Sequence, residues 1–191
     1  MREKIKLEGK FVTLEEIEPK FFPYVIKWRN DPKLNRYLNQ PFVLTEELER
    51  KWYEETYLPD EKQGFLIAVD KKSGEPFGTT GWINLDLEKR LCITMRLLSI
   101  SPAYAFQMME ARLLTSDYLY EQVDTHFGQV SLENIEAVRC NEMCGYVENK
   151  NEPMFPELLH VNGISMIEII RTKEQYLEAR RKLHEKFPKR F

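Results

Sequence analysis

The alternation of apolar and polar residues in the first half of the chain predicts strands and short helices. A period of two marks strands, because successive side chains point to opposite faces, while Pro, Asn and Asp mark helix starts and stops. The predicted elements are a strand at 11–17, a helix from Pro23 to the Asn30-Asp31-Pro32 break, a helix capped by Thr45 and ended at Pro59, and strands at 64–69, 77–85 and 91–98. The last three strands are expected to form an antiparallel meander, because Lys71 to Gly74 is a hairpin turn.

After Pro102 the pattern becomes that of an α/β protein. The predicted elements are a long, mostly buried helix at 103–122, a strand at 125–130, a helix at 134–143, a short strand at 145–147, a hairpin turning at Asn162-Gly163 and a final helix that shows Tyr176, Ala179 and Leu183 on one face. Thr172 and Gln175 form a capping box at the start of that helix. Strands alternate with helices here, so we expect parallel pairing around the long helix.

Length and composition indicate one globular domain spanning residues 1–191. The chain is 42% hydrophobic and 12% aromatic, with only 8 Gly and 10 Pro, which excludes a disordered or low-complexity protein. A chain of this size buries roughly 70% of its unfolded surface and needs no metal or disulfide to fold. Cys92, Cys140 and Cys144 lie in apolar segments, so we expect reduced thiols and no metal site.

Charge and apolar runs limit the partners. The longest apolar runs, such as Phe65 to Val69, are far shorter than the ~20 residues that cross a bilayer, and Met1 to Lys6 lacks the apolar core of a signal peptide. We therefore expect a cytoplasmic protein without a membrane partner. The 28 basic and 31 acidic residues are interspersed, which argues against nucleic acid as the main partner.

The order of elements resembles the GCN5-related N-acetyltransferase (GNAT) fold over essentially the whole chain. Local marks of the resemblance are Trp28 to Pro32, Phe77 to Gly81, and Asn134 to Ala137 followed by Cys144-Gly145-Tyr146. The resemblance implies a mixed central sheet with an antiparallel N-terminal meander, splayed fourth and fifth strands, and helices on both faces. Residues 130–146 are the most specific of these marks and are similar to the segment shared by bacterial acyltransferases that act on amino sugars of nucleotide-linked intermediates.

The resemblance also implies a reaction. An acyl group, acetyl in the simplest case, would pass from acyl-CoA as cosubstrate to a small-molecule amine by direct attack in a ternary complex. Strand 91–98 would meet the thioester through free backbone N–H groups, and the entrance to the long helix would hold the pyrophosphate, since helix N-termini favour anions. The residues expected to bind the coenzyme are Leu97, Leu98, Ser99, Ala103, Tyr104, Ala105, Phe106 and Asn134.

The phosphate loop departs from the family pattern. Ala103, Tyr104, Phe106 and Met108 stand where the family has an arginine and glycines that let the backbone approach the phosphates. Three alternatives follow. The loop takes another course after Pro102, the coenzyme binds differently or weakly, or the protein is a binding module that has lost catalysis.

Two residues are the catalytic candidates. Many family members place a tyrosine near the thiolate seven residues after the asparagine that corresponds to Asn134, but this chain has Asn141 there. Asn141 either donates a hydrogen bond to sulfur or is a solvent-facing helix residue. Asp86, near Asn84 at a strand end, either accepts the amine proton or is a turn residue.

Acceptor recognition is expected from the first two helices, where the superfamily varies with substrate. Aromatic faces stack on sugars or bases, and arginine binds phosphate bidentately. The residues concerned are Trp28, Arg29, Asn30, Tyr37, Asn39, Gln40 and Trp52, with Asn84 on the same side. Core packing is the alternative for both tryptophans, whereas Tyr37 and Gln40 are expected at the surface.

Other acceptors and other polar residues stay open. A polyamine or a protein N-terminus is the alternative acceptor, and the acidic pairs Glu46-Glu47, Glu54-Glu55 and Asp60-Glu61 would suit a polyamine or simply be solvated. We expect His126, His160 and His184 to be structural or exposed, and Glu110 to favour its helix N-terminal half. The acyl chain and a homo-oligomeric state are left open.

Overall fold

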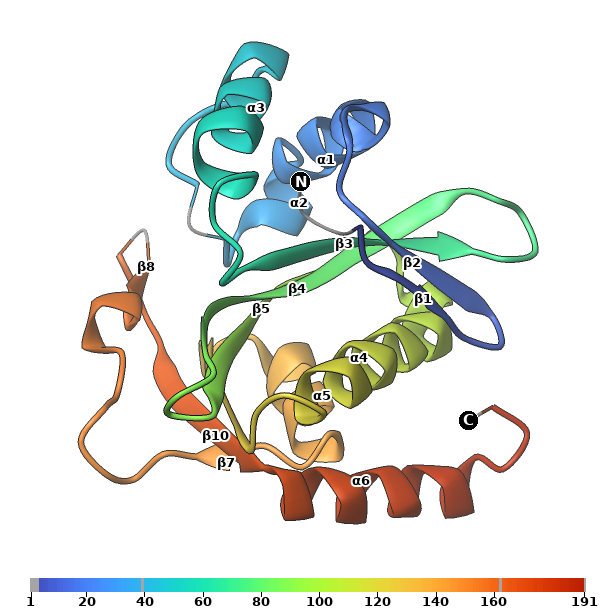
Figure 1. Ribbon diagram of the computed structural model, residues 1–191, viewed down its shortest axis with the longest axis vertical. Coiled ribbons are helices and arrows are strands. Elements are labelled where there is room, and N and C mark those ends of the chain that lie inside the picture. Colours follow the sequence, from blue (N-terminus) through green and yellow to red (C-terminus); the bar gives the residue numbers. More distant parts are fainter. Residues whose placement is uncertain (1–3, 39, 162, 191) are drawn as a thin grey trace.

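An eight-stranded mixed sheet in the order β1-β2-β3-β4-β5-β6-β10-β7 runs through the molecule (Figure 1). The computed structural model describes residues 4–38, 40–161 and 163–190. The strands are β1 (Lys6–Glu8), β2 (Val12–Glu16), β3 (Gly64–Asp70), β4 (Pro76–Asp86), β5 (Leu91–Ser99), β6 (Thr125–Val130), β7 (Val147–Glu148) and β10 (Ile167–Thr172), beside a separate hairpin of β8 (His160–Val161) and β9 (Ile164–Ser165). β3, β4 and β5 form the predicted antiparallel meander, β2 adds to it by antiparallel pairing with β3, and β5 pairs with β6 in parallel.

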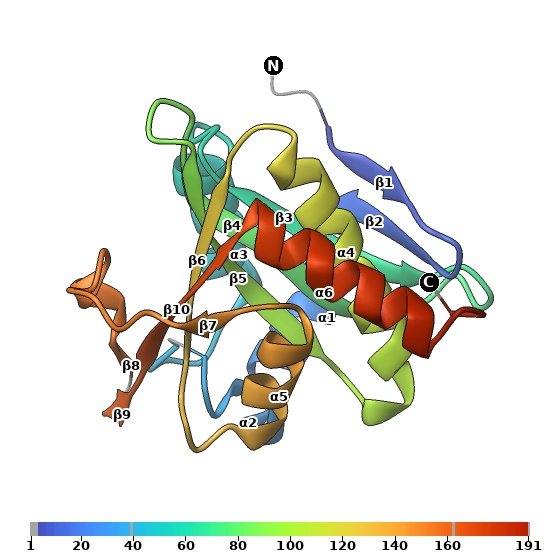
Figure 2. The ribbon, with the colours of Figure 1, turned by 90° about the horizontal axis from the view of Figure 1, so that it is seen from below.

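Helices cover both faces of this sheet. The helices are α1 (Phe22–Arg29), α2 (Pro32–Asn35), α3 (Glu46–Trp52), α4 (Ala105–Tyr120), α5 (Ile135–Met143) and α6 (Lys173–Lys186). The first three lie on one side of the sheet, and α4, α5 and α6 lie on the other (Figures 1 and 2). The mixed sheet with helices on both faces confirms the predicted fold class.

Three helix starts follow directly from side-chain caps. Thr45 accepts from the backbone N–H of Leu48, and Asn134 accepts from that of Ala137. Thr172 and Gln175 make both bonds of the predicted capping box. Each cap satisfies a backbone donor that the helix leaves open and stabilises the fold by about 1 kcal/mol.

A few predicted boundaries differ from the structure. The long helix starts with a 3-10 turn at Pro102–Tyr104 before α4, and Pro32 begins α2 instead of only ending α1. Gly145 adopts φ +86°, so the strand predicted at 145–147 begins at Val147. β1 was not predicted. Met1 to Glu3, Asn39 and Asn162 lie outside the described residues.

Strand β3 is covered on both faces. Its neighbouring residues Leu66 and Ile67 are both fully buried, yet they belong to different apolar clusters because successive strand side chains point in opposite directions. Ile67 packs with Phe22 under the first helices, while Leu66 packs with Leu119 of α4. Full burial of such a side chain stabilises the fold by about 1.5–3 kcal/mol.

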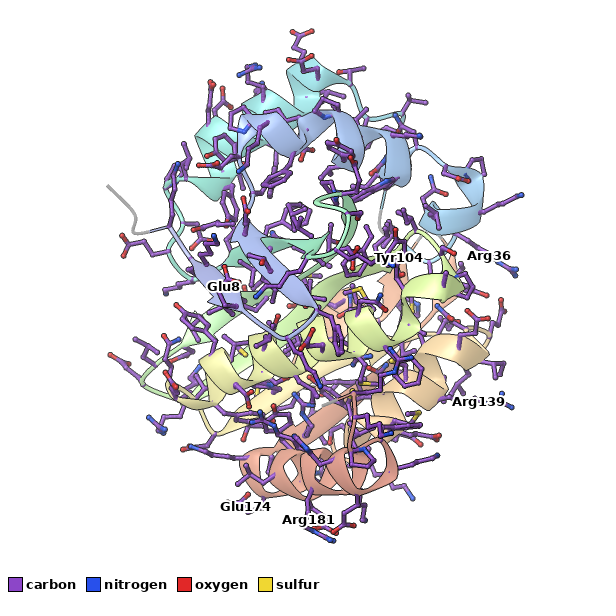
Figure 3. The ribbon with its side chains drawn as sticks, turned by 90° about the vertical axis from the view of Figure 1, so that its right-hand side faces the viewer. Glu8, Arg36, Tyr104, Arg139, Glu174 and Arg181 are labelled. Carbon is purple, nitrogen blue, oxygen red and sulfur yellow. The ribbon has the colours of Figure 1, made fainter. Side chains whose placement is uncertain are left out.

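The surface carries charges of both signs. Arg139, Glu174 and Arg181 project outward from α5 and α6 (Figure 3). In the part of the chain that the structure describes, no helix is long and apolar enough to cross a membrane.

Candidate active site

The parallel strands β5 and β6 part after a short stretch of pairing. They pair only from Leu91 with Thr125 to Ile93 with Phe127, although β5 continues to Ser99 and β6 to Val130. The Thr94 hydroxyl donates to the Phe127 carbonyl at 3.2 Å and is a side-chain link just past the last pair. Beyond it the strands present backbone edges to each other across a gap, which confirms the predicted splay.

A β-bulge shapes the β5 wall of this gap. Thr79 pairs with Leu98 and Gly81 pairs with Met95, so two residues of β5, 96 and 97, lie opposite one residue of β4. Arg96 has φ +62°, and its carbonyl accepts from the Thr79 hydroxyl at 2.5 Å. A bulge interrupts the ladder and leaves backbone groups without a strand partner. The bulge therefore makes the middle of β5 suitable for binding a ligand through its backbone.

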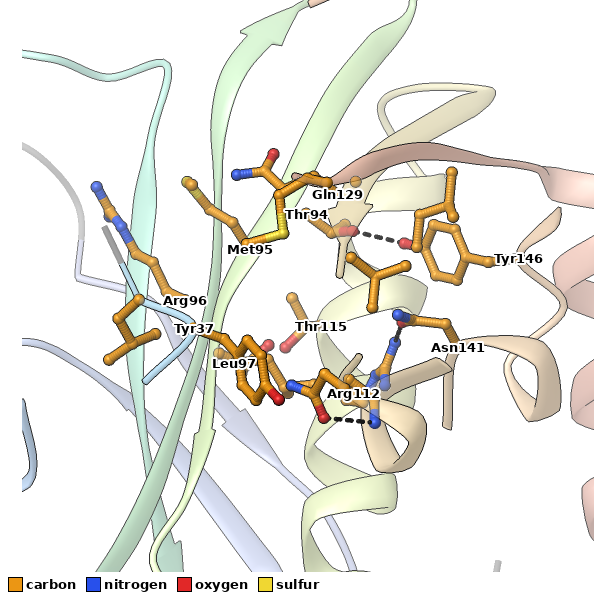
Figure 4. Close-up of a pocket in the computed structure, with 18 of the residues that line it drawn as sticks. Tyr37, Thr94, Met95, Arg96, Leu97, Arg112, Thr115, Gln129, Asn141 and Tyr146 are labelled. Carbon is orange, nitrogen blue, oxygen red and sulfur yellow. Dashed lines mark hydrogen bonds between the residues drawn. The ribbon is translucent and has the colours of Figure 1, made fainter. Parts of the chain in front are cut away.

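A cavity of about 250 Å³ fills the gap between the two strands (Figure 4). Its walls come from β4, β5, β6, β10, α4, α5 and α2 with the segment that follows it. The lining residues are Leu34, Tyr37, Leu38, Thr80, Thr94, Met95, Arg96, Leu97, Arg112, Thr115, Ser116, Gly128, Gln129, Val130, Asn134, Ala137, Asn141, Tyr146, Met166 and Ile169. Among these described residues there are two arginines and no carboxylate, so the cavity favours neutral or anionic groups.

The closed end of the cavity is polar. The Tyr146 and Thr94 hydroxyls lie 2.6 Å apart (Figure 4). The buried Arg171 guanidinium packs 4.3 Å from the Tyr146 ring centre and donates to Ser116, while its contact with His126 Nδ1 is 3.0 Å. Burial raises the pKa of Tyr146, so the phenol stays protonated at neutral pH.

A second arginine occupies the helix side of the cavity. Arg112 of α4 donates from Nη2 to Asn141 Oδ1 at 2.6 Å (Figure 4). Its Nη1 donates to Cys140 Sγ at 2.9 Å. Burial lowers the pKa of Arg112, but its interactions with Cys144, Cys140 and Tyr146 together raise that pKa above its usual value. Conversely, hydrogen bonding from Cys144 and the nearby guanidinium lower the pKa of the Cys140 thiol.

The bulky residues of the expected phosphate loop pack away from the cavity. The Tyr104 ring stacks on Phe77 with 4.5 Å between ring centres, and Phe106 packs edge-on against Phe187. Met108 is buried, and its sulfur lies beside Gly78 of β4. None of these side chains lines the cavity. At the turn before α4, the Ser101 hydroxyl accepts from the Ala103 N–H.

The residues predicted to bind the coenzyme lie in three places. Leu97 and Asn134 line the cavity, and Asn134 also caps α5. Leu98 is buried in the sheet, and the Ser99 hydroxyl donates to the Ser101 carbonyl. The residues on the entrance to α4, outside the cavity lining, are Ala103, Tyr104, Ala105 and Phe106.

Of the residues predicted for acceptor recognition, Tyr37 lies at the cavity. Its hydroxyl donates to the Glu133 carbonyl at 3.4 Å, and Arg36 forms an ion pair with Glu133 at 3.6 Å. These two contacts link the segment after α2 to the loop before α5. Asn39 lies outside the described residues.

The remaining acceptor predictions fall on structural residues. Trp28 is in the core, and Asn30 bonds both the N–H and the carbonyl of Leu44. Gln40 is buried, contrary to the surface position expected, because its amide donates to the carbonyls of Arg29 and Phe42. Arg29 is partly buried near the buried Glu49, and desolvation lowers the pKa of Arg29 and raises that of Glu49. Trp52 packs against Tyr57 and Phe65.

Asp86 and Asn84 lie in the β4–β5 hairpin and not at the cavity. The Asp86 carboxylate accepts from the N–H groups of Glu88 and Lys89, and the Lys89 contact chiefly lowers its pKa. Asn84 is exposed with φ +51°. The hairpin adjoins the paired end of β5 and β6, so it lies beyond the closed end of the gap. A general base would have to lie at the cavity, and Asp86 does not.

Sequence reasoning missed several cavity residues. Arg112, Thr94, Tyr146 and Gly128 all line the cavity. Arg112 could have been identified from the sequence, because it is an arginine in a helix whose other residues indicate burial. Thr94 and Tyr146 lie 52 positions apart in the sequence and meet only through the fold.

Comparisons with known proteins agree on the fold. No family model matches the sequence, and no curated protein sequence matches it. Spermidine N-acetyltransferase from Vibrio cholerae, in complex with CoA and spermine, is similar at TM-score 0.71 and 17% identity, covering 88% of this chain and 99% of its own.

Two further solved structures cover nearly all of this chain. Apo FdhC, a nucleotide-linked sugar GNAT, has TM-score 0.75 and 12% identity over 98% of this chain and 99% of its own. A GCN5-related N-acetyltransferase from Brucella melitensis has TM-score 0.75 and 16% identity over 96% and 86%. At these identities the similarity establishes the fold.

Proposed function

We propose that this chain, which has the fold of the GCN5-related N-acetyltransferases, transfers an acyl group from acyl-CoA to the amino group of a nucleotide-linked amino sugar. The observation that carries the proposal is the cavity between β5 and β6, which combines parted strand edges with a bulge at residues 96 and 97. The pantetheine arm would lie along β5 in place of a missing strand, and the thioester would face the bulge.

The chemistry required is modest. Direct aminolysis of a thioester needs the two reactants held at near-attack distance and donors for the oxyanion that forms on the carbonyl. Backbone N–H groups at the bulge would supply the donors. Asn134 and Leu97 would contact the pantetheine, since both line the cavity. The acyl-CoA itself would bind as a cosubstrate and leave as CoA.

Charge supports an amino-sugar acceptor over a polyamine. The spermidine and nucleotide-sugar enzymes match this fold equally well, so the comparisons alone do not choose. Charge complementarity favours a polycation at a site with carboxylates and disfavours it beside other cations, and the described lining contains Arg96 and Arg112 but no Asp or Glu. The acidic pairs at 46–47, 54–55 and 60–61 lie on and after α3, outside the lining.

Binding of acetyl-CoA is the first test. A ligand at 100 times its Kd stabilises the folded state by about 2.7 kcal/mol, so melting with and without acetyl-CoA should show a clear shift. Gly128 offers a matched pair of variants, since a Cβ there would lie 3.4 Å from the Thr94 carbonyl across the gap. Gly128→Ala should bind, whereas Gly128→Leu should fill the gap and abolish binding.

The acceptor is tested by CoA release. The unmodified protein with acetyl-CoA is incubated with UDP- and dTDP-linked amino sugars, spermidine, or a short peptide with a free N-terminus. We expect thiol release with a nucleotide-linked amino sugar. Release with spermidine or the peptide would redirect the acceptor and keep acyl transfer, whereas no binding of acetyl-CoA would overturn the proposed function and favour a binding module.

A further inference from the structure

Arg112 is a cation that has no carboxylate partner among the described residues at the cavity wall. Its two acceptors are the amide oxygen of Asn141 and the sulfur of Cys140, and no carboxylate among the described residues forms an ion pair with it. Arg180 of α6, by contrast, pairs with Asp117 of the same helix α4 at 2.5 Å. An arginine has five N–H donors, so Arg112 keeps donors for a ligand.

The other arginine of the lining is differently engaged. Arg96 turns toward the far side of the sheet, where it donates to the Gln63 side chain and the Gly64 carbonyl. Arg112 instead reaches across from α4 to α5 on the helix side of the cavity (Figure 4). The positive charge of the cavity is therefore concentrated on the wall that faces β5.

The cavity is small, so a thioester bound inside it would lie close to both of its walls. At about 250 Å³ it lies below the roughly 300–1,000 Å³ of typical small-molecule sites. A thioester inside it, with the carbonyl oxygen toward the bulge of β5, would direct its sulfur toward the opposite wall. Arg112 and Asn141 belong to that wall.

We propose that Arg112 is a catalytic residue that stabilises the negative charge on sulfur as the thioester breaks. This inference rests on the proposed function. The amine lone pair forms the new N–C bond, the C–S bond breaks, and its electron pair goes to sulfur. The proton of the former amine passes to water, and CoA leaves as a thiolate that takes a proton from solvent. Arg112 keeps its own protons throughout.

Asn141 and Cys140 act as positioning residues in this scheme. Their two contacts fix both terminal nitrogens of the guanidinium, so the remaining N–H groups point in a defined direction. A preorganised charge of this kind contributes about 10²–10³-fold to kcat when it faces the developing charge. The thiolate would thus be stabilised without a tyrosine at position 141.

The test uses the product CoA and needs no acceptor. The thiol pKa of bound CoA is measured by ultraviolet thiolate absorbance, with desulfo-CoA bound to the same protein as the blank that cancels Cys140 and the other cysteines. An opposite charge within about 4–6 Å lowers a pKa by about 1–3 pH units. We expect bound CoA to show such a lowering, Arg112→Lys to keep part of it, and Arg112→Met to lose it while still binding desulfo-CoA.

If Arg112→Met does not fold, the CoA measurement on the unmodified protein still tests the inference. CoA that binds with the pKa of free CoA overturns the role of Arg112 and leaves the proposed function standing, whereas absence of CoA binding overturns both. Tighter binding of succinyl-CoA than acetyl-CoA, lost in Arg112→Lys as well as Arg112→Met, would assign Arg112 to a carboxylate of the donor and also overturn the inference.

Discussion

The Tyr146 hydroxyl donates to the Thr94 hydroxyl at the point where β5 and β6 part. The direction follows from the second contact of Thr94, whose hydroxyl proton goes to the Phe127 carbonyl. Two side chains thus continue the bonding between the strands after the ladder has ended, and they define the closed end of the cavity.

Removing either hydroxyl should destabilise the fold by different amounts. Tyr146→Phe loses one hydrogen bond and should cost about 0.5–1.5 kcal/mol in free energy of unfolding. Thr94→Val leaves the Tyr146 hydroxyl and the Phe127 carbonyl unpaired, and such losses cost about 1–3 kcal/mol. Urea unfolding of both variants and of the double variant gives the coupling energy. Additive effects would show that the two hydroxyls do not interact in solution.

The aromatic residues at the start of α4 should not obstruct the coenzyme. Tyr104 stacks on Phe77 and lies outside the cavity lining, so Tyr104→Ala should leave the Kd for acetyl-CoA unchanged in calorimetry. The lost packing should lower the free energy of unfolding by about 0.5–3 kcal/mol. Phe106→Ala, at a more exposed ring, is the matched variant. Binding that appears only in a variant would mean that the ring occupies the site.

Local signals made much of the fold predictable from sequence. Thr45, Asn134 and Thr172 each bond an N–H three residues away, so their caps depend on neighbouring residues alone. The strands could be predicted for the same reason. The spacing of apolar residues along a strand reflects whether one or both of its faces are buried.

The site was less predictable, because it depends on long-range packing. Arg112 and Asn141 meet only because α4 packs beside α5. Asp86 and Leu97 both lie toward strand ends that sequence reasoning assigned to the site, but the pairing of β5 with β6 at residues 91–93 decides which end opens. Leu97 lies at the open side, and Asp86 lies beyond the closed one.

Glu110 should prove structural. Its carboxylate is buried and accepts from the backbone N–H groups of Lys10 at 2.6 Å and Phe11 at 2.9 Å, which fixes the β1–β2 turn to α4. Glu110→Ala should therefore lower the free energy of unfolding by about 1.5–3 kcal/mol, the scale for hydrogen bonds to a charged group. Glu121→Ala, at the exposed end of the same helix, should change it by less than about 0.5 kcal/mol. Equal effects in chemical unfolding would contradict this role.

His126 should make the protein sensitive to mild acid. Its imidazole is fully buried, stacks on Tyr120 with 3.8 Å between ring centres, and lies with Nδ1 at 3.0 Å from Arg171. Burial and then the guanidinium lower its pKa well below the usual 6.5. Between these two pKa values the unfolded chain binds a proton that the folded chain does not, so stability falls as pH drops below about 6.5.

One such proton changes the free energy of unfolding by up to about 1.4 kcal/mol per pH unit. His126→Asn removes the titrating group and keeps an oxygen near the position of Nδ1 to accept from Arg171, so its stability should depend less steeply on pH. Urea unfolding between about pH 5 and 7 measures both slopes. His184→Asn, on the exposed face of α6, is the control and should keep the original slope. Parallel curves for the unmodified protein and His126→Asn would show that His126 does not titrate abnormally, since carboxylates common to both proteins cancel in the difference.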